Sequence, residues 1–289
     1  MSVWIEAAIL VFCRGPENSL RDAAGERAWA EPLVGFSSGS DPLYQHYKTV
    51  VGADHWAPSE AFTLGFPGIK GDAVDFVVIS WILPQTTATR ADNRDEMLFP
   101  SERWARSRIF GEAFNDQLRR HLIDVLATRG IQAVAPVLLP EWRSFDSELF
   151  VFSSKWSERH AAYASGLGTF GLCDGLITTK GKAVRAGSVI ACIPEQHSRP
   201  LPTPRPYSHH QEYCLFFDDG SCGDCMARCP VGAITAAGHD KQRCKQHLIE
   251  TEAYVSTHFG FDGYGCGLCQ TGVRCESRAP ARNDHASIP

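Results

Sequence analysis

The cysteines of this chain gather in two stretches, CLFFDDGSCGDCMARCPVGAI at residues 214–234 and CGLCQTGVRC at residues 266–275. Together they hold seven of the eleven cysteines, and Cys244 lies between them. Cys222, Cys225 and Cys229 follow the spacing C-x2-C-x3-C-P, which resembles that of bacterial proteins with two iron–sulfur clusters. There the cysteine before the proline binds the cluster that its neighbours do not hold. Two [4Fe–4S] clusters need eight thiolates, and eight are available here.

Two other uses of cysteine compete with this interpretation. Paired C-x2-C units also bind zinc in four-cysteine sites, but the Cys229-Pro230 ending and the interleaved spacing favour clusters. A disulfide framework is typical of secreted proteins, and nothing in the sequence marks the chain for secretion. The pattern therefore predicts two [4Fe–4S] clusters with the ligands Cys214, Cys222, Cys225, Cys229, Cys244, Cys266, Cys269 and Cys275.

One position departs from the regular spacing. A cysteine is expected three residues before Cys222, and the chain has Asp219 there. Cys214, five residues earlier, is the natural replacement if it reaches in from a longer loop. We therefore predict one cluster on Cys214, Cys222, Cys225 and Cys275, and the other on Cys229, Cys244, Cys266 and Cys269.

Composition and charge indicate a globular protein without a nucleic-acid footprint. The 289 residues suffice for one large domain and a small one. The net charge of −5 offers no basic patch by composition alone. The apolar run Ala7–Cys13 is too short to span a bilayer, follows no basic residue and is not preceded by a twin-arginine pair. We expect a cytoplasmic protein with no membrane partner and no nucleic-acid partner.

The N-terminal two thirds predict strands around a long helix. Residues 14–72 indicate loops with short helices that begin near Pro42 and Pro58. The run Ala73–Leu83, AVDFVVISWIL, is apolar at nearly every position, which predicts a strand covered on both faces. Ser101 is the expected N-cap of a helix that ends near Gly130. Its buried stripe is Phe110, Phe114, Leu118, Leu122 and Leu126, and Ile131–Leu139 and Gly187–Cys192 predict further strands.

A glycine-rich stretch follows a shorter helix. Trp156–Ser165 predicts that helix, and GLGTFG at Gly166–Gly171 comes directly after it. Three glycines let the backbone approach a flat or bulky group closely. The dinucleotide fingerprint needs a strand before the glycines, so it does not apply here. The alternative is a tight turn between packed elements.

Together these features resemble the epoxyqueuosine reductases, which are relatives of the corrinoid-dependent reductive dehalogenases. The resemblance runs from about residue 150 to residue 276. It rests on Glu158-Arg159 before an alanine-rich helix, GLGTFG, the strand that begins at Gly187-Ser188, a proline-rich linker, the cysteine pattern and Arg243-Cys244.

The resemblance implies an α+β fold, with a nitroreductase-like domain that binds base-off cobalamin and a small ferredoxin-like domain that binds two clusters. It implies that the corrinoid site is lined by Gly166, Gly168, Thr169, Phe170 and Gly171. Thr169 and Leu172 replace the Trp and Lys of the family's GLGWxGK, and Phe152 replaces an aspartate thought to donate a proton. Asp146 would serve instead only if the loop aligned differently. The helical-repeat tail of many members is also missing, which indicates a divergent branch.

The expected domain boundary is the stretch RPLPTPRP at Arg199–Pro206, because alternate prolines make a stiff, extended segment. We predict a nitroreductase-like corrinoid-binding domain at residues 1–198 and a ferredoxin-like domain at residues 207–276. Residues 277–289 show no periodicity and predict a flexible tail.

Three residues on the helix before the glycines are candidate proton donors: Glu158, His160 and Tyr163. Glu158 alternatively pairs with an arginine, and His160 is alternatively a surface residue. Tyr163 carries a hydroxyl that can donate. Outside the cluster pattern, Cys173 either faces the cofactor or packs as a small apolar side chain.

We therefore expect a cobalamin-dependent iron–sulfur reductase that cleaves a small molecule, with two clusters relaying electrons from an external donor such as a ferredoxin or flavodoxin. Because Phe152 cannot donate a proton, we expect poor activity on epoxyqueuosine in tRNA. Three alternatives stay open: an electron carrier for another corrinoid or flavin protein, a flavin enzyme on the same fold, and an epoxyqueuosine reductase acting on tRNA.

Overall fold

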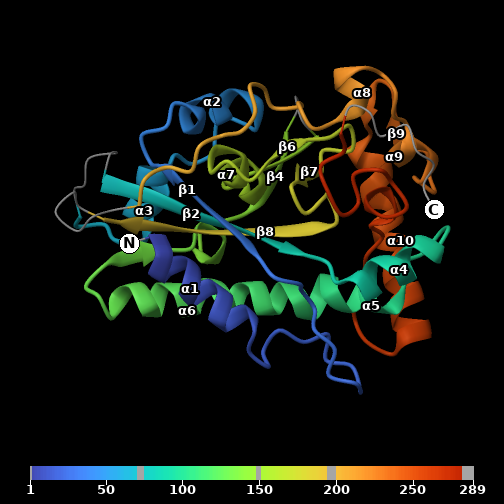
Figure 1. Cartoon of the computed structure of the whole chain (residues 1–289), viewed down its shortest axis with the longest axis horizontal. Helices are drawn as coiled ribbons and strands as arrows, with labels where there is room; N and C mark the ends of the chain where they lie inside the picture. Colours follow the sequence, from blue (N-terminus) through green and yellow to red (C-terminus); the bar gives the residue numbers. More distant parts are fainter. Residues whose placement is uncertain (1, 70–74, 148–150, 194–199, 282–289) are drawn as a thin grey trace.

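A computed structural model describes residues 2–69, 75–147, 151–193 and 200–281 of the chain. A four-stranded antiparallel sheet lies between two layers of helices (Figure 1). Its strands, in spatial order, are β1 (Leu33–Ser38), β2 (Phe76–Pro84), β8 (Val184–Cys192) and β3 (Gln132–Val134).

The central strand β2 is buried along its whole length. Alternate residues point to opposite faces of a strand. Val77, Ile79 and Trp81 accordingly enter one core, and Phe76 and Val78 enter the other. Because helices cover both faces, nearly every position of β2 is apolar, and the prediction of a doubly covered strand is confirmed.

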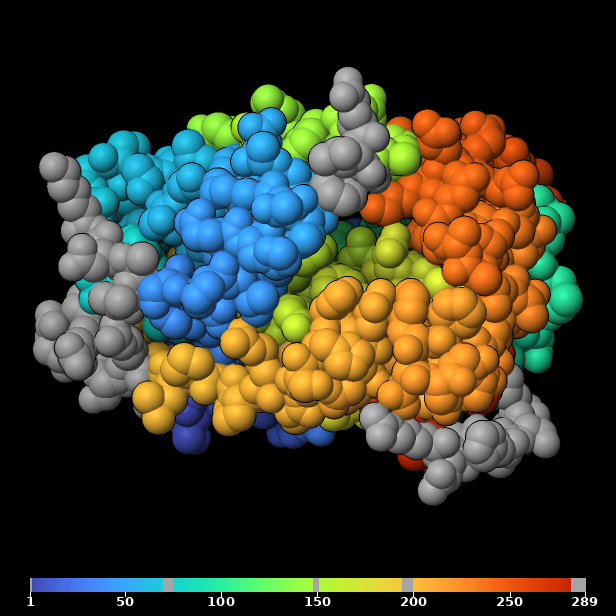
Figure 2. All heavy atoms as spheres, turned by 90° about the horizontal axis from the view of Figure 1, so that it is seen from above, coloured from blue at the N-terminus to red at the C-terminus, as the bar shows by residue number. Residues whose placement is uncertain are grey.

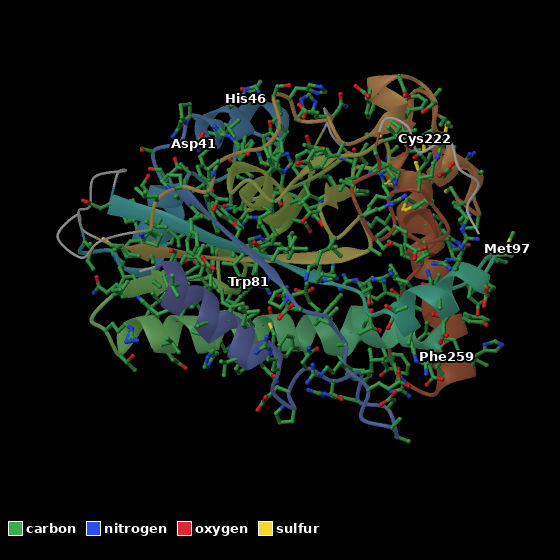
Figure 3. All side chains as sticks on the ribbon, viewed as in Figure 1. Asp41, His46, Trp81, Met97, Cys222 and Phe259 are labelled. Carbon is green, nitrogen blue, oxygen red and sulfur yellow. The ribbon has the colours of Figure 1, made fainter. Side chains whose placement is uncertain are left out.

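The first helix layer consists of α1 (Ser2–Cys13) and α6 (Glu112–Ala127), which lie below the sheet in Figure 1. Figure 3 shows Trp81 between this layer and the sheet, and its Nε1 donates to Asn115 Oδ1 of α6 at 2.8 Å. Four members of the predicted stripe are buried on α6: Phe114, Leu118, Leu122 and Leu126.

The long helix begins where the sequence predicts it. Ser101 Oγ accepts a hydrogen bond from the Trp104 N–H at 3.3 Å, which caps α5 (Glu102–Arg106). A π-helical segment, Ser107–Gly111, then joins α5 to α6. A side chain at Gly111 would collide with the Trp29 ring, 2.7 Å from an added Cβ. The predicted helix is therefore confirmed, with one irregular turn in it.

The second layer covers the opposite face of the sheet with α2 (Leu43–Val50), α3 (Pro58–Gly65) and α7 (Glu158–Ala164). Trp156, buried just before α7, stacks on Tyr44 at 5.8 Å between ring centroids. Beside this layer lies the hairpin of β4 (Ser144–Ser147) and β5 (Val151–Ser154).

The remaining elements, all short except α10, gather at one end of the sheet, beside α4 (Thr87–Asp95) and α5 (Figure 1). They are the hairpin β6 (Gly168–Phe170) and β7 (Leu176–Thr178), α8 (Leu215–Asp218), α9 (Asp224–Ala227), β9 (Ile234–Thr235), β10 (Gly238–His239), the longer α10 (Lys241–Phe259) and a 3₁₀ turn at Leu268–Gln270.

Several parts of the fold differ from the sequence-based prediction. The predicted strand Ile131–Leu139 ends at Val134, and Pro136–Leu138 forms a 3₁₀ turn because proline cannot donate to a sheet. The helices α1, α4 and α10, the edge strand β1 and the hairpin β4–β5 were not predicted. The mixed α+β architecture is confirmed, whereas the ferredoxin-like character of residues 207–276 stays a prediction.

The described part of the linker lies along the edge of the sheet. The Thr203 N–H donates to the Phe36 carbonyl at 2.8 Å, and Thr203 Oγ1 accepts from the Phe36 N–H at 2.9 Å. Arg199 and the end of the tail, residues 282–289, lie outside the described residues. Within the described ranges no helix is long and apolar enough to cross a membrane.

Candidate cofactor and substrate site

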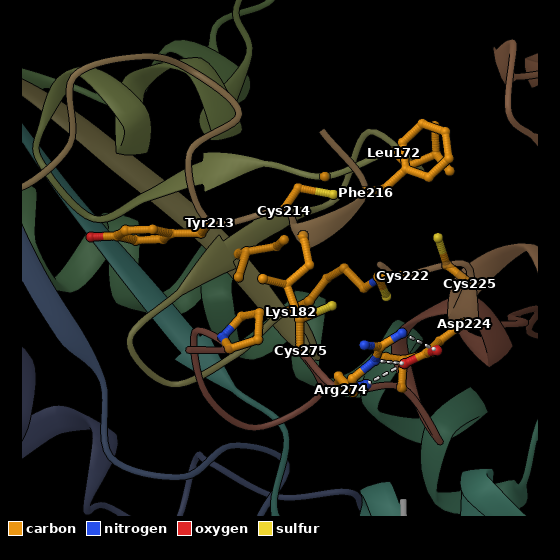
Figure 4. Close-up of a pocket in the computed structure, with 15 residues that line it drawn as sticks. Leu172, Lys182, Tyr213, Cys214, Phe216, Cys222, Asp224, Cys225, Arg274 and Cys275 are labelled. Carbon is orange, nitrogen blue, oxygen red and sulfur yellow. Dashed lines mark hydrogen bonds and ion pairs between the residues drawn. The ribbon is translucent and has the colours of Figure 1, made fainter. Parts of the chain in front are cut away.

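Four cysteines line one pocket, which we call the cysteine pocket: Cys214, Cys222, Cys225 and Cys275 (Figure 4). They come from the N-terminus of α8, the loop before α9, α9 itself and the C-terminal stretch. These are the four cysteines predicted to share one cluster. Burial raises the pKa of Cys275 to about 11, so a positively charged metal centre would be needed to hold it as a thiolate.

The other four predicted ligands lie on the α10 side of this pocket. The thiol of Cys266 interacts with those of Cys244 and Cys229, and Cys269 interacts with Cys266. Burial raises the pKa of Cys266 to about 11. The grouping agrees with the predicted second set, and its role as a cluster ligand set stays a prediction.

The thiols are spread out rather than converging on a point. Among the described residues, no three His, Cys, Asp or Glu side chains are placed to hold a single metal ion. A cubane spaces its four thiolates further apart than one ion does, because each sulfur binds a different iron atom.

Cys173 lies between the two sets. Its buried thiol interacts with those of Cys225 and Cys269, one cysteine from each predicted set. The sequence left open whether Cys173 faces a corrinoid or packs, and the structure places it among the predicted cluster ligands. The cysteine motif of residues 214–275 could not indicate this position, because Cys173 lies about forty residues before the motif in the sequence.

Polar side chains hold the cysteine loops in place. Asp224 Oδ2 accepts from the Arg274 backbone N–H at 2.9 Å and from Arg274 Nε at 3.1 Å, which joins the two cysteine stretches. Glu276 pairs with Arg94 at 2.7 Å and anchors the end of the second stretch to α4. At Gly267, where φ is +68°, an added Cβ would lie 1.9 Å from Trp104, so only glycine fits.

A second hollow, which we call the large cavity, has a volume of about 750 Å³. It lies between α6, the start of α7, the Val184 end of β8 and the loop around Cys266. Figure 2 shows the upper face of the molecule hollowed between α2, the segment after residue 200 and the C-terminal region, although α2 and residues 200–247 do not line the large cavity. Cys266 and Lys182 both line the large cavity, so it adjoins the cysteine region directly.

Charged residues of both signs line the large cavity. Buried Arg119 pairs with Asp116 at 2.6 Å and with Glu158 at 3.0 Å. Arg185 pairs with Glu112 at 2.5 Å. The sequence analysis did not identify these charged residues. The one sign of them in the sequence was Arg119, which follows Leu118 on the apolar side of a predicted helix. Further lining residues are Arg108, Arg159, Trp104, Trp142 and Tyr264.

Two buried polar atoms on the wall of the large cavity, Gln85 Oε1 and Arg119 Nε, have no hydrogen-bond partner among the described residues. Buried polar groups are nearly always paired, but both of these atoms are shielded from solvent, so they do not open onto the cavity itself. The peripheral amides of a corrinoid are both donors and acceptors. The volume of the large cavity and the donors and acceptors among its lining residues fit that group.

Of the three candidate proton donors, only Glu158 lines the large cavity. Its carboxylate accepts hydrogen bonds from Ser188 and from Arg119, which matches the alternative that Glu158 pairs with an arginine. Burial raises the pKa of Glu158. His160 packs against Phe170 and Tyr47, and burial lowers its pKa well below the usual range. Tyr163 stacks on Tyr207 at 5.1 Å.

The glycine stretch Gly166–Gly171 does not line the large cavity but packs against other parts of the backbone. An added Cβ at Gly168 would lie 2.3 Å from the Ile177 carbonyl, and one at Gly166 would lie 2.7 Å from the Pro204 carbonyl. Thr169 Oγ1 accepts from the Tyr213 N–H at 2.9 Å, and Gly171 lines the cysteine pocket. These glycines permit close backbone packing here, and the predicted corrinoid contacts of Gly166–Gly171 stay untested.

The hairpin β4–β5 contains Phe152, which stands where the resembling family has an aspartate thought to donate a proton. Phe152 pairs directly with Asp146 across the hairpin, so both side chains lie on one face of it. Lys245 Nζ lies 4.2 Å from the centre of the Phe152 ring. Asp146 is exposed, and neither residue lines the large cavity.

Comparison with curated proteins finds two epoxyqueuosine reductases, and no family model matches the chain. The protein from Bacillus subtilis (strain 168) is 28% identical over 169 residues, which are 56% of this chain and 38% of the relative. The Bacillus anthracis protein is 25% identical over 147 residues, 49% of this chain and 35% of the relative. The predicted resemblance is confirmed. The chain spans less than two fifths of the length of these epoxyqueuosine reductases.

Similar solved structures are epoxyqueuosine reductases and a reductive dehalogenase. The Bacillus subtilis epoxyqueuosine reductase gives a TM-score of 0.47 at 18% identity, over 89% of this chain and 64% of that chain. An epoxyqueuosine reductase with a tRNA-Tyr stem loop gives 0.48 at 19%, over 84% and 61%. The catabolic reductive dehalogenase NpRdhA gives 0.46 at 15%, over 96% and 36%.

The prediction of a small-molecule substrate and no nucleic-acid partner is wrong. Both curated relatives are epoxyqueuosine reductases, and one similar structure holds an epoxyqueuosine-modified tRNA stem loop. The error came from using net charge, which says nothing about local distribution. Five cationic residues line the large cavity despite the net charge of −5: Arg108, Arg119, Arg159, Lys182 and Arg185.

Proposed function

We propose that this protein is an iron–sulfur and corrinoid-dependent reductase that removes the epoxide oxygen of a modified nucleoside in tRNA. The observation that carries the proposal is the adjacency of the two sites: Cys266, a predicted cluster ligand, lines the large cavity. The similarity to two epoxyqueuosine reductases supports the reaction class. The overall change consumes two electrons and two protons and releases the oxygen as water.

The large cavity is where we place both the corrinoid and the reacting nucleoside. Gln85, Glu112 and Arg119 line the large cavity, and their side chains would offer donors and acceptors to the amide groups of the corrinoid. The aromatic rings of Trp104 and Trp142 offer flat surfaces. A corrinoid bound there supplies a strongly reducing cobalt centre, and the [4Fe–4S] clusters supply single electrons at low potential.

Glu158 is the residue that we assign to proton transfer. As the carbon–oxygen bond of the epoxide breaks, the oxygen becomes an alkoxide that needs a proton. Glu158 lines the cavity, and burial raises its pKa toward the range in which a carboxyl group carries a proton. Its Oε1 is fixed by Arg119 and its Oε2 by Ser188, so the group is held in one orientation.

The test is complementation of a bacterial strain that lacks its own epoxyqueuosine reductase, with queuosine and epoxyqueuosine in tRNA measured by mass spectrometry. We expect the wild-type protein to restore queuosine and Cys266→Ala to leave epoxyqueuosine. Glu158→Gln should slow the conversion by about 10²–10⁴-fold. Tyr163→Phe is the matched control, because Tyr163 lies on the same helix but not on the cavity. Unconverted epoxyqueuosine with a wild-type protein that holds both clusters would refute the proposal.

A further inference from the structure

One buried cation lies among the cysteines. The side chain of Lys182 lines the cysteine pocket and also the large cavity (Figure 4), and only 3% of the residue is exposed. A lysine is almost never fully buried without a compensating charge. Its burial at the junction of the two sites therefore requires an explanation.

The backbone fixes the position of Lys182. Its N–H donates to the Cys275 carbonyl at 2.7 Å. The preceding Gly181 has φ +82°, and an added Cβ there would lie 2.2 Å from the Glu276 carbonyl. The stem of the side chain packs over Gly175, whose added Cβ would meet Lys182 Cδ at 3.1 Å. The ammonium group is thus positioned by a turn that is pressed against the last cluster cysteine.

The groups around the ammonium of Lys182 are sulfurs. They belong to Cys173, Cys275, Cys269 and Cys225, and the last three, as predicted cluster ligands, would be negatively charged thiolates once a cluster is bound. Nearby carboxylates have other partners: Asp224 pairs with Arg274, and Glu276 pairs with Arg90 and Arg94. In the described ranges no salt bridge of Lys182 with a carboxylate is formed.

We propose that Lys182 is the electrostatic counter-charge of the iron–sulfur centre and sets its reduction potential, chiefly that of the cluster on Cys214, Cys222, Cys225 and Cys275. This inference rests on the proposed presence of the clusters but not on the proposed substrate. An electron that enters a cluster makes it more negative, and a fixed ammonium group in a water-poor site stabilises that reduced form. Lys182 would therefore not contact the substrate but would act on the reaction through the potential of the cluster.

The experiment is a redox titration of anaerobically purified protein, reduced stepwise with dithionite and followed by electron paramagnetic resonance. We expect Lys182→Met, which keeps the stem and removes the charge, to shift the midpoint of one cluster to more negative potential, with a smaller shift in the other. Lys182→Arg should stay close to the wild type. Lys180→Met is the matched control, because Lys180 lies on the same turn but its Nζ donates to the Glu31 carbonyl at the surface.

Each outcome bears on the proposal. Loss of iron from Lys182→Met, with iron kept in Lys182→Arg, would also support the counter-charge role. Unchanged midpoints in Lys182→Met, equal shifts in the Met and Arg variants, or loss of iron from both would overturn it. A wild-type protein without clusters would refute both this inference and the proposed function. Intact clusters and the expected shift, with no queuosine formed, would refute only the proposed function.

Discussion

The sheet region and the cysteine region are held together by different means. In the sheet region, strands of nine residues lie between two helix layers, and side chains such as Trp81 and Leu118 are fully buried. In the cysteine region, α8 and α9 have four residues each, and β9 and β10 have two each. Helices this short are unstable alone. The first region is built by extensive apolar burial, whereas the second has a smaller apolar cluster, in which cysteines pack with Leu172, Ile177, Ile234 and Val273, together with a few polar contacts.

The largest expected effect is the loss of a cluster. We expect the wild-type protein to hold about eight iron atoms and Cys214→Ala to hold about half, because each cubane has about four iron atoms and four thiolate ligands. Iron analysis and electron paramagnetic resonance would measure this, with one of two signals lost. Cys13→Ala, a buried cysteine of the sheet region, is the control and should keep the full iron content.

One result would reassign the ligand. If Cys214→Ala kept both clusters and Asp219→Ala lost one, Asp219 would be the fourth ligand of the first cluster. The expectation for Cys214 rests on its place in the cysteine pocket together with Cys222, Cys225 and Cys275.

The same contrast explains what could be predicted from the sequence. Apolar periodicity located β2, β8 and the long helix, because in the sheet region burial dictates residue type. It missed α1, which is apolar on most of its faces, so its buried residues Ile5 and Ile9 do not stand out. It also extended β3 through Pro136, where apolar residues continue after the strand ends.

The cysteine motif predicted which four thiols line the cysteine pocket, since a cluster of fixed size would impose such a spacing. The large cavity was not predictable in this way, because its wall combines residues from α6, β8 and the cysteine loops that are distant in sequence. Lys182 and Cys173 belong to no motif. The GLGTFG stretch was assigned to a corrinoid site by the family resemblance, and a tight turn between packed elements was the alternative. In the fold Gly168 approaches the backbone of β7.

The second prediction concerns the sheet region, where a buried histidine, His55, should make the free energy of unfolding depend on pH. Burial lowers the pKa of His55 to about 4, and its Nε2 accepts from the Ser157 N–H at 3.2 Å. The unfolded chain has a histidine pKa near about 6.5. The stability due to neutral His55 is therefore complete above that pH and is lost as the pH falls toward 4, by up to about 3 kcal/mol.

We would measure this loss by denaturant unfolding at several pH values, followed by tryptophan fluorescence. His55→Gln should reduce the pH dependence of the unfolding free energy, whereas His46→Gln, at an exposed position of α2, should leave it unchanged. Equal pH dependence in the wild type and in His55→Gln would contradict the assignment. Comparing variants at each pH removes the effect of acid on the clusters, which all of them share.

The smallest expected effect tests the junction between the two regions. Asn93 of α4 is fully buried, and its Nδ2 donates to the Cys266 carbonyl at 3.2 Å and to Thr271 Oγ1 at 3.1 Å. Its Oδ1 accepts from the Ser101 N–H at 3.0 Å, at the N-cap of α5. One side chain thus joins the cysteine loop to the long helix. Asn93→Ala should lower the unfolding free energy by about 1–3 kcal/mol, because it leaves buried partners unsatisfied.

The matched control is Asn18, which is buried and makes three hydrogen bonds of 2.9 Å to the backbone of Cys13 and Trp29 in the sheet region. Asn18→Ala should cost a similar amount, but the location of the effect should differ. In hydrogen exchange, Asn93→Ala should lower protection at residues 265–272, whereas Asn18→Ala should leave that loop unchanged. If both variants loosened the loop equally, the two regions would unfold as one unit. The clusters would then stabilise the whole chain, because opening the cysteine loop would require opening the sheet as well.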